Sequence, residues 1–427
     1  MGKTIESRNA RPDSLTKRDK FIIEATQQFN TQGYYDTRLE DIAEKLGVCK
    51  TSLSYHFKSK EGLLAAAYSN SCDFSEEQLK VAATARTGLD RALAYIESHL
   101  RAHANALCGL QSPLALLNDL SGLVDTDHEV ILIRYQSQIH SFKHFLCDGI
   151  RDGSVSISSV DAATFFAFNV LNWSPNWLET VPEHRRNDAI ESYCDILRNG
   201  LCTSKDRPKT IPISRSSFGA DVAIFDRGAR NNLKREAFLR TGIRYLNQNG
   251  YRKLSLDDIA AELGVTRGAF YYQIADKDTF LFESFDRTCN LIEEALELSL
   301  KRGDTPALVE LEQSVRWLFE GHLTGHDPLL KLNLIDLLGD AQRISINTRL
   351  RKLRALYAEL IARGMMDGSI RTVDIEAAEY IIFGAIFLAS GRRLATTTLA
   401  ETWSPQMEPV SASAAYFEPL IEGFSGK

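Results

Sequence analysis

A nineteen-residue stretch that occurs twice constrains the fold of this chain more than any other feature of the sequence. LEDIAEKLGVCKTSLSYHF begins at Leu39, and LDDIAAELGVTRGAFYYQI begins at Leu256. The alignment continues without a gap on both sides, and a second, weaker similarity surrounds Asp152 and Asp367. Solenoid repeats have periods of about 20–50 residues, whereas this period has the length of a whole domain. The chain is therefore predicted to be a head-to-tail duplication of one module of roughly 200 residues.

Apolar residues recur at helical spacing through most of the sequence, which predicts an all-α fold. In the first copy one helical face is apolar and a glycine then predicts the helix end: Phe21, Ile22, Ala25, Phe29 and Gly33. The second copy repeats this pattern at Phe238, Leu239, Gly242, Leu246 and Gly250. Near Asp152 and Asp367 the sequence Asp-Gly-Ser predicts a turn between two helices in each half.

Each copy of the repeated stretch has the pattern of a helix-turn-helix. In the first copy a short helix ends at Gly47, and a second helix starts a few residues later. The apolar residues that are predicted to lock the two helices together at a steep angle are Ile42, Ala43, Leu46, Val48 and Leu53. Ala43 is small where the second helix crosses, and a glycine accepts the left-handed turn conformation. All-α proteins also use such helix pairs purely as structure, so a DNA-binding role depends on the exposed residues.

Reading of DNA needs an exposed first turn on the second helix, with neighbouring groups that hold phosphates. The candidates in the first copy are Lys50, Thr51, Ser54 and Tyr55, with Lys60 just beyond and Thr37 before the motif. The candidates in the second copy are Arg267, Gly268, Tyr271 and Tyr272, with Lys277 just beyond and Ser255 before the motif. Thr37 and Ser255 are predicted to cap the first helix of the motif or to bind phosphate. The buried-face residues match between the copies and the exposed ones differ, as two different DNA half-sites would require.

GYYDTRLEDIAEKLGVCKTSLSYHFKSKEGLL and GYRKLSLDDIAAELGVTRGAFYYQIADKDTFL resemble the DNA-binding region of the tetracycline-repressor (TetR/AcrR) family of bacterial transcription regulators. The resemblance implies DNA contacts at most of the candidates above and adds His56. The sequence departs from the family pattern at Arg38 and Cys49, where small hydroxyl residues are usual, and at Gln273-Ile274, where His-Phe is usual. Family members are normally homodimers with one motif per chain. This chain is therefore expected either to act as its own intramolecular pseudo-dimer or to form a homodimer.

The repeat and the resemblance together imply an order of domains. A flexible N-terminus at 1–14 precedes a first helix-turn-helix domain at 15–69 and a first ligand-binding and pairing domain at 70–202. After a linker at 203–227, the order repeats with a second helix-turn-helix domain at 228–286 and a second ligand-binding and pairing domain at 287–427. The cations of the linker, Lys205, Arg207, Lys209 and Arg215, fit either a solvated tether or a segment that contacts phosphates.

Aromatic and amide side chains in the first larger domain are candidates to line an effector cavity: Phe142, Phe145, Phe168, Asn169, Asn172 and Trp173. The same spacing also fits a plain core or a pairing seam. The sequence NWSPNW resembles the start of the pairing helices in family members that sense acyl-CoA thioesters or similar apolar metabolites, so an effector of that kind is expected. In the second half, the residues interpreted as solvated turn positions are His322, His326, Asp336 and Asp340.

Composition restricts the remaining function classes. With 44% apolar and 25% charged residues, and with no apolar run of membrane-spanning length, the chain reads as an ordinary globular protein without a membrane partner. Seven scattered cysteines without CxxC spacing are typical of reduced thiols in a cytoplasm and not of disulfides or zinc. There is no phosphate loop, Gly-x-Ser-x-Gly elbow or metal motif, so neither an enzyme nor a cofactor is expected. The net charge of −6 means that any DNA binding must depend on local surfaces.

The sequence therefore predicts a cytoplasmic transcription regulator that binds double-stranded operator DNA and is a repressor released by a small molecule. The alternative is an effector-binding or assembly protein whose second head has lost DNA binding.

Overall fold

The computed structural model describes residues 15–116, 122–204, 213, 227–249, 251, 254–300, 305–389 and 407–426. The predicted N-terminus 1–14 and nearly all of the predicted linker 203–227 lie outside the described residues. The described part of the chain is all-α, with one isolated β-bridge between Cys202 and Ile370, which confirms the predicted fold class. It forms two compact units. Unit 1 contains the described residues up to 155 and residues 174–194, and unit 2 contains residues 156–173 and the described residues from 195 onward.

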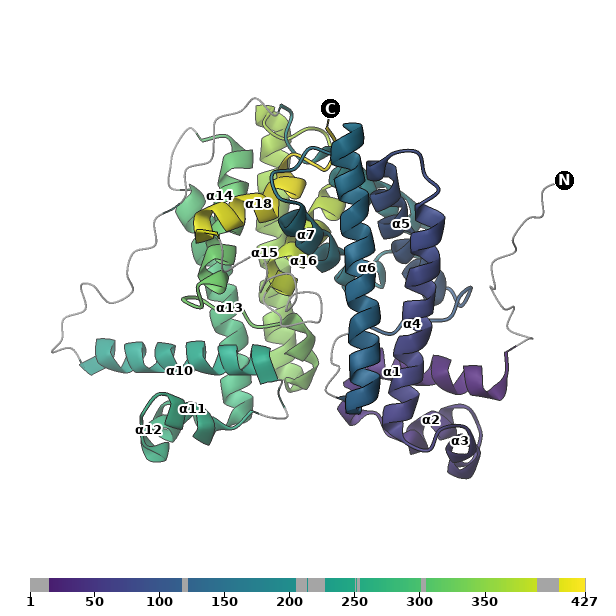
Figure 1. Ribbon diagram of the computed structural model, residues 1–427. Helices are drawn as coiled ribbons and strands as arrows, with labels where there is room; N and C mark the ends of the chain where they lie inside the picture. Colours follow the sequence, from purple (N-terminus) through teal and green to yellow (C-terminus); the bar gives the residue numbers. More distant parts are fainter. Residues whose placement is uncertain are drawn as a thin grey trace. The chain divides into compact units, whose positions relative to one another are not determined.

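Unit 1 begins with three helices of a helix-turn-helix head, α1 (Lys17–Asp36), α2 (Leu39–Lys45) and α3 (Lys50–His56). The body of the unit consists of α4 (Lys60–Ala82), α5 (Gly88–Leu107) and α6 (Asp125–Asp152), followed by α8 (Ser174–Leu178), the 3-10 helix η3 (Glu183–Arg185) and the start of α9 (Arg186–Asn199). The long helix α4 connects the two parts, because its first turns pack on α1 and the rest of the helix packs on α5 and α6 (Figure 1).

Unit 2 contains the second head, α10 (Arg227–Asn249), α11 (Leu256–Glu262) and α12 (Arg267–Gln273). Its body consists of α13 (Lys277–Leu300), α14 (Ala307–Leu323), η4 (Leu332–Leu337), α15 (Asp340–Asp367), α16 (Ile375–Ala389) and α18 (Pro409–Ile421). One helix from the first half of the sequence, α7 (Val160–Asn172), also belongs to this unit. None of the helices in the described residues combines the length and the apolar composition that a membrane crossing needs.

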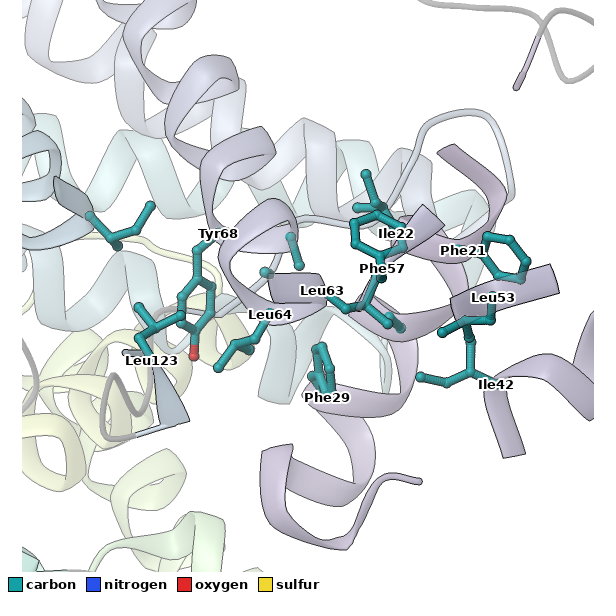
Figure 2. Close-up of a cluster of buried hydrophobic side chains, with 14 of the residues drawn as sticks. Phe21, Ile22, Phe29, Ile42, Leu53, Phe57, Leu63, Leu64, Tyr68 and Leu123 are labelled. Carbon is teal, nitrogen blue, oxygen red and sulfur yellow. The ribbon is translucent and has the colours of Figure 1, made fainter. Parts of the chain in front are cut away.

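The predicted apolar face of the first helix forms the core of head 1 (Figure 2). Phe21 and Ile22 are each 2% exposed, and they pack with Ile42 and Leu53 of the helix-turn-helix, which are both fully buried. Full burial of one such side chain stabilises a fold by about 1.5–3 kcal/mol, so these few contacts fix the angle between α2 and α3. Gly33, with φ of 79°, interrupts α1 where the sequence predicts a helix end.

The core of head 2 is packed like that of head 1, except that one residue is smaller and a neighbouring residue is larger. Gly242 takes the place of Ala25, and Phe280 takes the place of Leu63 in the gapless alignment. A Cβ atom on Gly242 would lie 2.2 Å from Cζ of Phe280 and 3.1 Å from Cδ1 of Ile259. The larger ring at one position therefore occupies the space that the methyl group fills in head 1.

Both predicted Asp-Gly-Ser turns are present, and they make the same hydrogen bonds. The carboxylate of Asp152 accepts from the backbone N–H of Gly88 at 2.8 Å, and that of Asp367 accepts from Ala307 at 2.9 Å. The following glycine has a φ of 77° in the first copy and 78° in the second. A glycine accepts this left-handed conformation at little cost, so each turn ends one long helix and ties the start of another to it.

Helix α7 packs inside unit 2 on helices of the second half, α16 and α18. The side-chain amide of Asn169 donates to the hydroxyl of Tyr416 at 2.9 Å, and that hydroxyl donates to the carbonyl of Ala385 at 2.9 Å. The ring of Trp173 stacks on Phe387 with centroids 6.2 Å apart. A helix from the first half of the sequence, before the predicted boundary at residue 202, thus completes the body of unit 2.

Candidate nucleic-acid interface

The two helix-turn-helix turns have the same backbone geometry. Gly47 and Gly264 both have φ of 65°, as the prediction of a left-handed turn requires. One residue later in each copy, Val48 donates its N–H to Ala43 and Val265 donates to Ala260, both at 3.0 Å. Because these bonds close the turn in both heads, the direction of α3 relative to α2 is reproduced by that of α12 relative to α11.

Helix α3 presents most of the predicted contact residues of head 1 to solvent. Lys50, Thr51 and Ser54 are exposed, and Tyr55 is 86% exposed, which is unusual for an aromatic side chain of a folded domain. His56 is partly buried, because its ring packs on Phe21 with centroids 5.6 Å apart. The exposed group forms one face at the start of α3, and His56 stands at its edge.

The first residue of the recognition helix in each head is a cation held by an acidic residue of the preceding helix. Lys50 forms an ion pair with Glu40, and Nε of Arg267 lies 3.0 Å from Oδ1 of Asp257. The hydrogen bond from Lys50 lowers the pKa of the Glu40 carboxyl and so keeps it ionised. Glu40 and Asp257 occupy the same position of the repeat, so both heads hold their leading cation in the same way.

A further contact at the start of α3 joins Cys49 and Thr51. The thiol Sγ of Cys49 lies 3.0 Å from the hydroxyl Oγ1 of Thr51, and this hydrogen bond lowers the pKa of the thiol. Cys49 occupies the N-cap position of α3 but caps no backbone N–H with its side chain.

The predicted phosphate-binding lysine of head 1 lies against an aromatic ring. Nζ of Lys60 is 4.5 Å from the ring centroid of Tyr34, whose hydroxyl donates to Oε1 of Glu61 at 2.9 Å. In head 2 the equivalent hydroxyl of Tyr251 donates to Oδ1 of Asp278 at 3.3 Å, and Lys277 is exposed. Each tyrosine therefore connects the end of the first helix of its head to the first turn of α4 or α13.

Helix α12 presents a different surface on the same frame. Tyr272 is 81% exposed, and a Cβ atom added to Gly268 would meet no atom within 4 Å, so this face is open. Tyr271 is 36% exposed and lies beneath the guanidinium of Arg267, with Cζ 5.5 Å from the ring centroid. Where head 1 offers the hydroxyls of Thr51 and Ser54, head 2 offers a bare backbone and a second tyrosine ring.

Thr37 requires a correction, because it is only 1% exposed and its hydroxyl donates to the carbonyl of Gly33 at 2.8 Å. It does not cap α2, whose N-cap residue is Arg38 and makes no side-chain cap bond. Ser255 does cap α11, since its hydroxyl accepts from the N–H of Asp258 at 3.2 Å. In the gapless alignment Ser255 stands opposite Arg38 and not opposite Thr37, so the two residues do not have equivalent roles.

The departure from His-Phe in head 2 leaves the packing of α12 intact. Ile274 is fully buried, and Phe57, its counterpart in head 1, is 5% exposed. Gln273 is partly exposed at the position where His56 stands in head 1.

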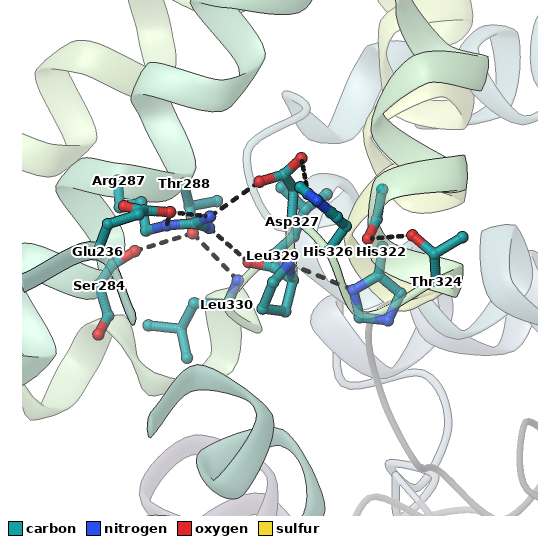
Figure 3. A network of polar contacts seen from close by, with 12 residues as sticks. Glu236, Ser284, Arg287, Thr288, His322, Thr324, His326, Asp327, Leu329 and Leu330 are labelled. Carbon is teal, nitrogen blue, oxygen red and sulfur yellow. Dashed lines mark hydrogen bonds and ion pairs between the residues drawn. The ribbon is translucent and has the colours of Figure 1, made fainter. Parts of the chain in front are cut away.

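Head 2 is attached to its body through a buried arginine that head 1 lacks (Figure 3). Arg287 of α13 is 6% exposed and donates to Oε1 of Glu236 on α10 at 2.7 Å. It also donates to Oδ1 of Asp327 at 3.1 Å and to the carbonyl of Pro328 at 3.0 Å, in the loop after α14. Asn70 is the aligned residue of the first half and is exposed. The first helix of head 2 is thus fixed to a body loop by charge-assisted bonds.

The same region corrects the interpretation of one histidine. His322 lies in the last turn of α14, is partly buried, and accepts the N–H of Leu329 through Nδ1 at 3.3 Å. Burial lowers its pKa, so it is not a freely solvated turn residue. His326 is exposed and lies 3.5 Å from Asp327 (Figure 3), and Asp340 is exposed and pairs with Arg343. Asp336 lies within η4.

The predicted effector residues divide between the two units. Phe142 and Phe145 are buried on α6 in unit 1, where Phe142 packs on Tyr95. The remaining residues lie in unit 2, where Asn169 and Trp173 contact the second-half helices as described above; they are Phe168, Asn169, Asn172 and Trp173. Asn169 and Trp173 therefore lie in the seam that the sequence offered as the alternative, and a ligand role for the six stays a prediction.

The sequence analysis did not identify the acidic residues that pair with Lys50 and Arg267. It also did not identify the tyrosines that connect the first helix of each head to α4 or α13. Glu40 and Asp257 are acidic in both copies of the repeat, and Tyr34 and Tyr251 are identical. Because these residues occupy matching positions in the two copies, a comparison of the copies could have identified them as functional. The Arg287 contacts have no counterpart in the first half, so the repeat held no indication of them.

Charge is distributed so that the heads are less acidic than the rest of the chain. Residues 15–69 contain eight Lys or Arg and seven Asp or Glu, and residues 228–286 contain nine and eight. The net charge of −6 therefore arises outside the heads. Two exposed helices, each led by a cation on a nearly neutral domain, give both heads the geometry of the helix-turn-helix class, in which the second helix can enter the major groove of DNA.

Comparison with known proteins agrees with this class. Residues 22–67 and 238–283 both match the family described as bacterial regulatory proteins, tetR family. The chain is 40% identical over 63 residues to the HTH-type transcriptional regulator RutR of Escherichia coli K12 and, with the same figures, to RutR of Shigella flexneri. The match covers 14% of this chain and 30% of the relative. Each of the two heads therefore matches the DNA-binding domain of the tetR family, and the chain carries that domain twice in tandem.

Two solved structures are similar to less than half of this chain. The TetR family regulator PfmR of Thermus thermophilus is 21% identical with a TM-score of 0.38, and the match covers 44% of this chain and all of that one. A TetR-family regulator of Bordetella parapertussis is 20% identical with a TM-score of 0.36 over 42% of this chain and 92% of that one.

Proposed function

We propose that this chain is a DNA-binding transcription regulator whose two unlike heads read two unlike half-sites of one operator. The observation that carries the proposal is the exposed start of each recognition helix. Lys50 and Arg267 lead these helices at equivalent positions, while the neighbouring contact residues differ in size and hydrogen bonding. An arginine can donate two hydrogen bonds to a guanine edge, whereas a lysine offers a single point charge. Operators without two-fold symmetry are therefore expected.

Selection of bound sequences from a random DNA library, using the full chain, tests this proposal. Lys50→Ala and Arg267→Ala are then compared on an operator in which each half-site is altered in turn. Lys50→Ala is expected to relax sequence preference in one half-site only, and Arg267→Ala in the other. If either substitution relaxes the sequence preference equally in both half-sites, the assignment of one head to each half-site is contradicted.

The predicted phosphate contacts have a separate test in the salt dependence of affinity. Lys60→Ala and Lys277→Ala are each expected to reduce the slope of log affinity against log salt by about 0.9, the loss of one phosphate contact. Lys80→Ala is a matched control, because Lys80 is exposed in the last turn of α4, at the opposite end of that helix from Lys60. If Lys277→Ala and Arg267→Ala leave both slope and affinity unchanged, head 2 has lost DNA binding and the alternative function, an effector-binding or assembly protein, replaces this one.

We further propose that the two halves pair within one chain as a pseudo-dimer. The packing of α7 on α16 and α18 supports this, because it joins first-half and second-half helices of the same polypeptide. Light scattering of the full chain with and without operator measures the outcome directly. A particle of 47.8 kDa is expected in solution, and a particle of twice that mass with four heads would favour a homodimer.

A small apolar or acyl-CoA-like effector that releases the operator completes the proposed function. Coupling between the two ligands is reciprocal. If the effector weakens operator binding, the operator-bound protein must bind the effector less tightly than the free protein does. Titration of a preformed complex with a series of acyl-CoA thioesters of increasing chain length tests this class. Release that grows with chain length supports an apolar site, and an unaltered complex across the series removes this effector class from the proposal. The proposed function also places the protein in the cytoplasm.

A further inference from the structure

Helix α6 carries two exposed histidines that the proposed DNA-binding function does not use. His140 and His144 are separated by four residues and therefore lie on the same face of the helix, one turn apart. Their Nε2 atoms are 2.9 Å apart, and their rings stand nearly perpendicular, with 87° between the planes. The two ring nitrogens are thus within hydrogen-bond distance of each other on the exposed face of the helix.

This separation matches the bite of a metal chelate. Imidazole nitrogens bind divalent transition metals at about 2.0–2.1 Å. Two ligands at a right angle with bonds of that length stand about 2.9 Å apart, whereas two tetrahedral ligands stand about 3.3 Å apart. The observed distance of 2.9 Å is that of a hydrogen bond between the two nitrogens, and it also equals the separation of neighbouring ligands on a square-planar or octahedral ion. Copper(II) and nickel(II) prefer these geometries with nitrogen ligands.

We propose that His140 and His144 form a two-histidine site for a divalent transition metal, copper(II) or nickel(II), with water in the remaining positions. Both rings are exposed, so binding needs no rearrangement of the core, and Nδ1 of each ring keeps the proton when Nε2 binds the metal. Cys147 follows one turn later on α6 and is partly exposed, so its contribution needs a variant of its own. The ion replaces a hydrogen bond between two solvated rings, which contributes little by itself.

A bound ion would brace the middle of α6, and α6 packs along α4, the helix that connects head 1 to the body of unit 1. Six residues before His140, Arg134 donates to Glu76 at 2.7 Å and to Asp73 at 2.6 Å on α4. The site therefore lies on the helix that holds the connecting helix of head 1 in place. Its effect on operator affinity is a second readout and not a condition of the proposal.

The experiment uses the full chain without an affinity tag and titrates it with copper(II) and with nickel(II) at neutral pH. Electron paramagnetic resonance reports the number of nitrogen ligands on copper, and calorimetry reports affinity and stoichiometry. One ion per chain with two imidazole nitrogens is expected. His140→Ala and His144→Ala are each expected to weaken binding by roughly tenfold or more, since even changes to groups behind a metal ligand cost that much. His184→Ala, another exposed histidine of unit 1, is the matched control and should bind as the unaltered chain does.

The proposal is overturned if the double variant His140→Ala/His144→Ala still binds one ion with two nitrogens, or if each single substitution leaves the affinity unchanged. Metal-free circular dichroism of every variant confirms that the fold is retained, as the exposure of both rings leads us to expect. Cys147→Ser is expected to keep the two-nitrogen spectrum. A spectrum that loses nitrogen coordination when Cys147 is replaced would contradict a site built from the two histidines alone.

Discussion

Gly242→Ala in head 2 is expected to destabilise unit 2, although alanine is the better helix former. The new methyl group would lie 2.2 Å from Cζ and 2.5 Å from Cε2 of Phe280, far inside van der Waals contact. Overpacking of a core by one such group costs up to about 3 kcal/mol, and the gain in helix propensity over glycine returns about 1 kcal/mol. The net loss is up to about 2 kcal/mol, which corresponds to a fall in Tm of up to about 4–8 °C for a unit of this size.

Head 1 supplies the compensating change. Ala25 and Leu63 occupy the equivalent positions and are both fully buried, so Gly242→Ala combined with Phe280→Leu recreates the packing of head 1. The double variant is expected to be more stable than Gly242→Ala alone. Differential scanning calorimetry measures the Tm, and hydrogen exchange of α10 and α13 shows whether the loss lies in head 2. A neutral or stabilising Gly242→Ala, or a Phe280→Leu that fails to rescue it, would refute the steric argument.

Three further predictions concern the contacts of the heads and the bodies. Glu40→Gln and Asp257→Asn each free a leading cation, so operator affinity in gel-shift titrations should rise and become more salt-dependent; a decrease would mean that the acids orient the cations for DNA. Arg287→Ala removes the buried cation that two partly buried carboxylates share and should cost about 3 kcal/mol of stability in thermal unfolding. Asn70→Ala should cost nothing measurable, and equal effects would contradict the difference in attachment. Burial lowers the pKa of His99 to about 4, so below pH 6.5 the unfolded chain takes up a proton that the folded chain refuses; Tm should fall as the pH drops from 7 to 5, and less steeply in His99→Gln.

The elements that the sequence predicted well depend on neighbours in the chain. Ile42, Ala43 and Leu53 are buried as the helical spacing predicts, and Gly47 has the left-handed conformation that a tight helix-turn-helix turn needs. These outcomes follow from local periodicity and backbone sterics, which the sequence contains directly. The duplication strengthened them, because each feature was present a second time at the same offset.

The contact residues were predicted less evenly, for a physical reason in each case. Thr37 was expected at the DNA surface, but its hydroxyl finds a closer acceptor in the carbonyl of Gly33 and turns inward. The pair of Lys50 and Glu40 joins residues ten positions apart on two helices, and only the crossing angle of those helices brings them together. The burial of His322 depends on a loop that returns over the end of α14. The periodicity of apolar side chains does not predict any of these three contacts.

The packing of α7 on second-half helices could not be predicted from the sequence. Helix periodicity shows that a face is apolar, but it does not show which helix covers that face. Its polar contacts, such as the bond from Asn169 to Tyr416, join residues more than two hundred positions apart.

That seam has a consequence for how the protein can change over time. Association between separate subunits weakens on dilution and forces both partners to carry every mutation, whereas helices tethered in one polypeptide stay together at any concentration. A substitution in one recognition helix of this chain leaves the other unaltered, and under the proposed intramolecular pairing two like heads are not brought together. Under the proposed function, each head can therefore adapt to its own DNA half-site independently of the other.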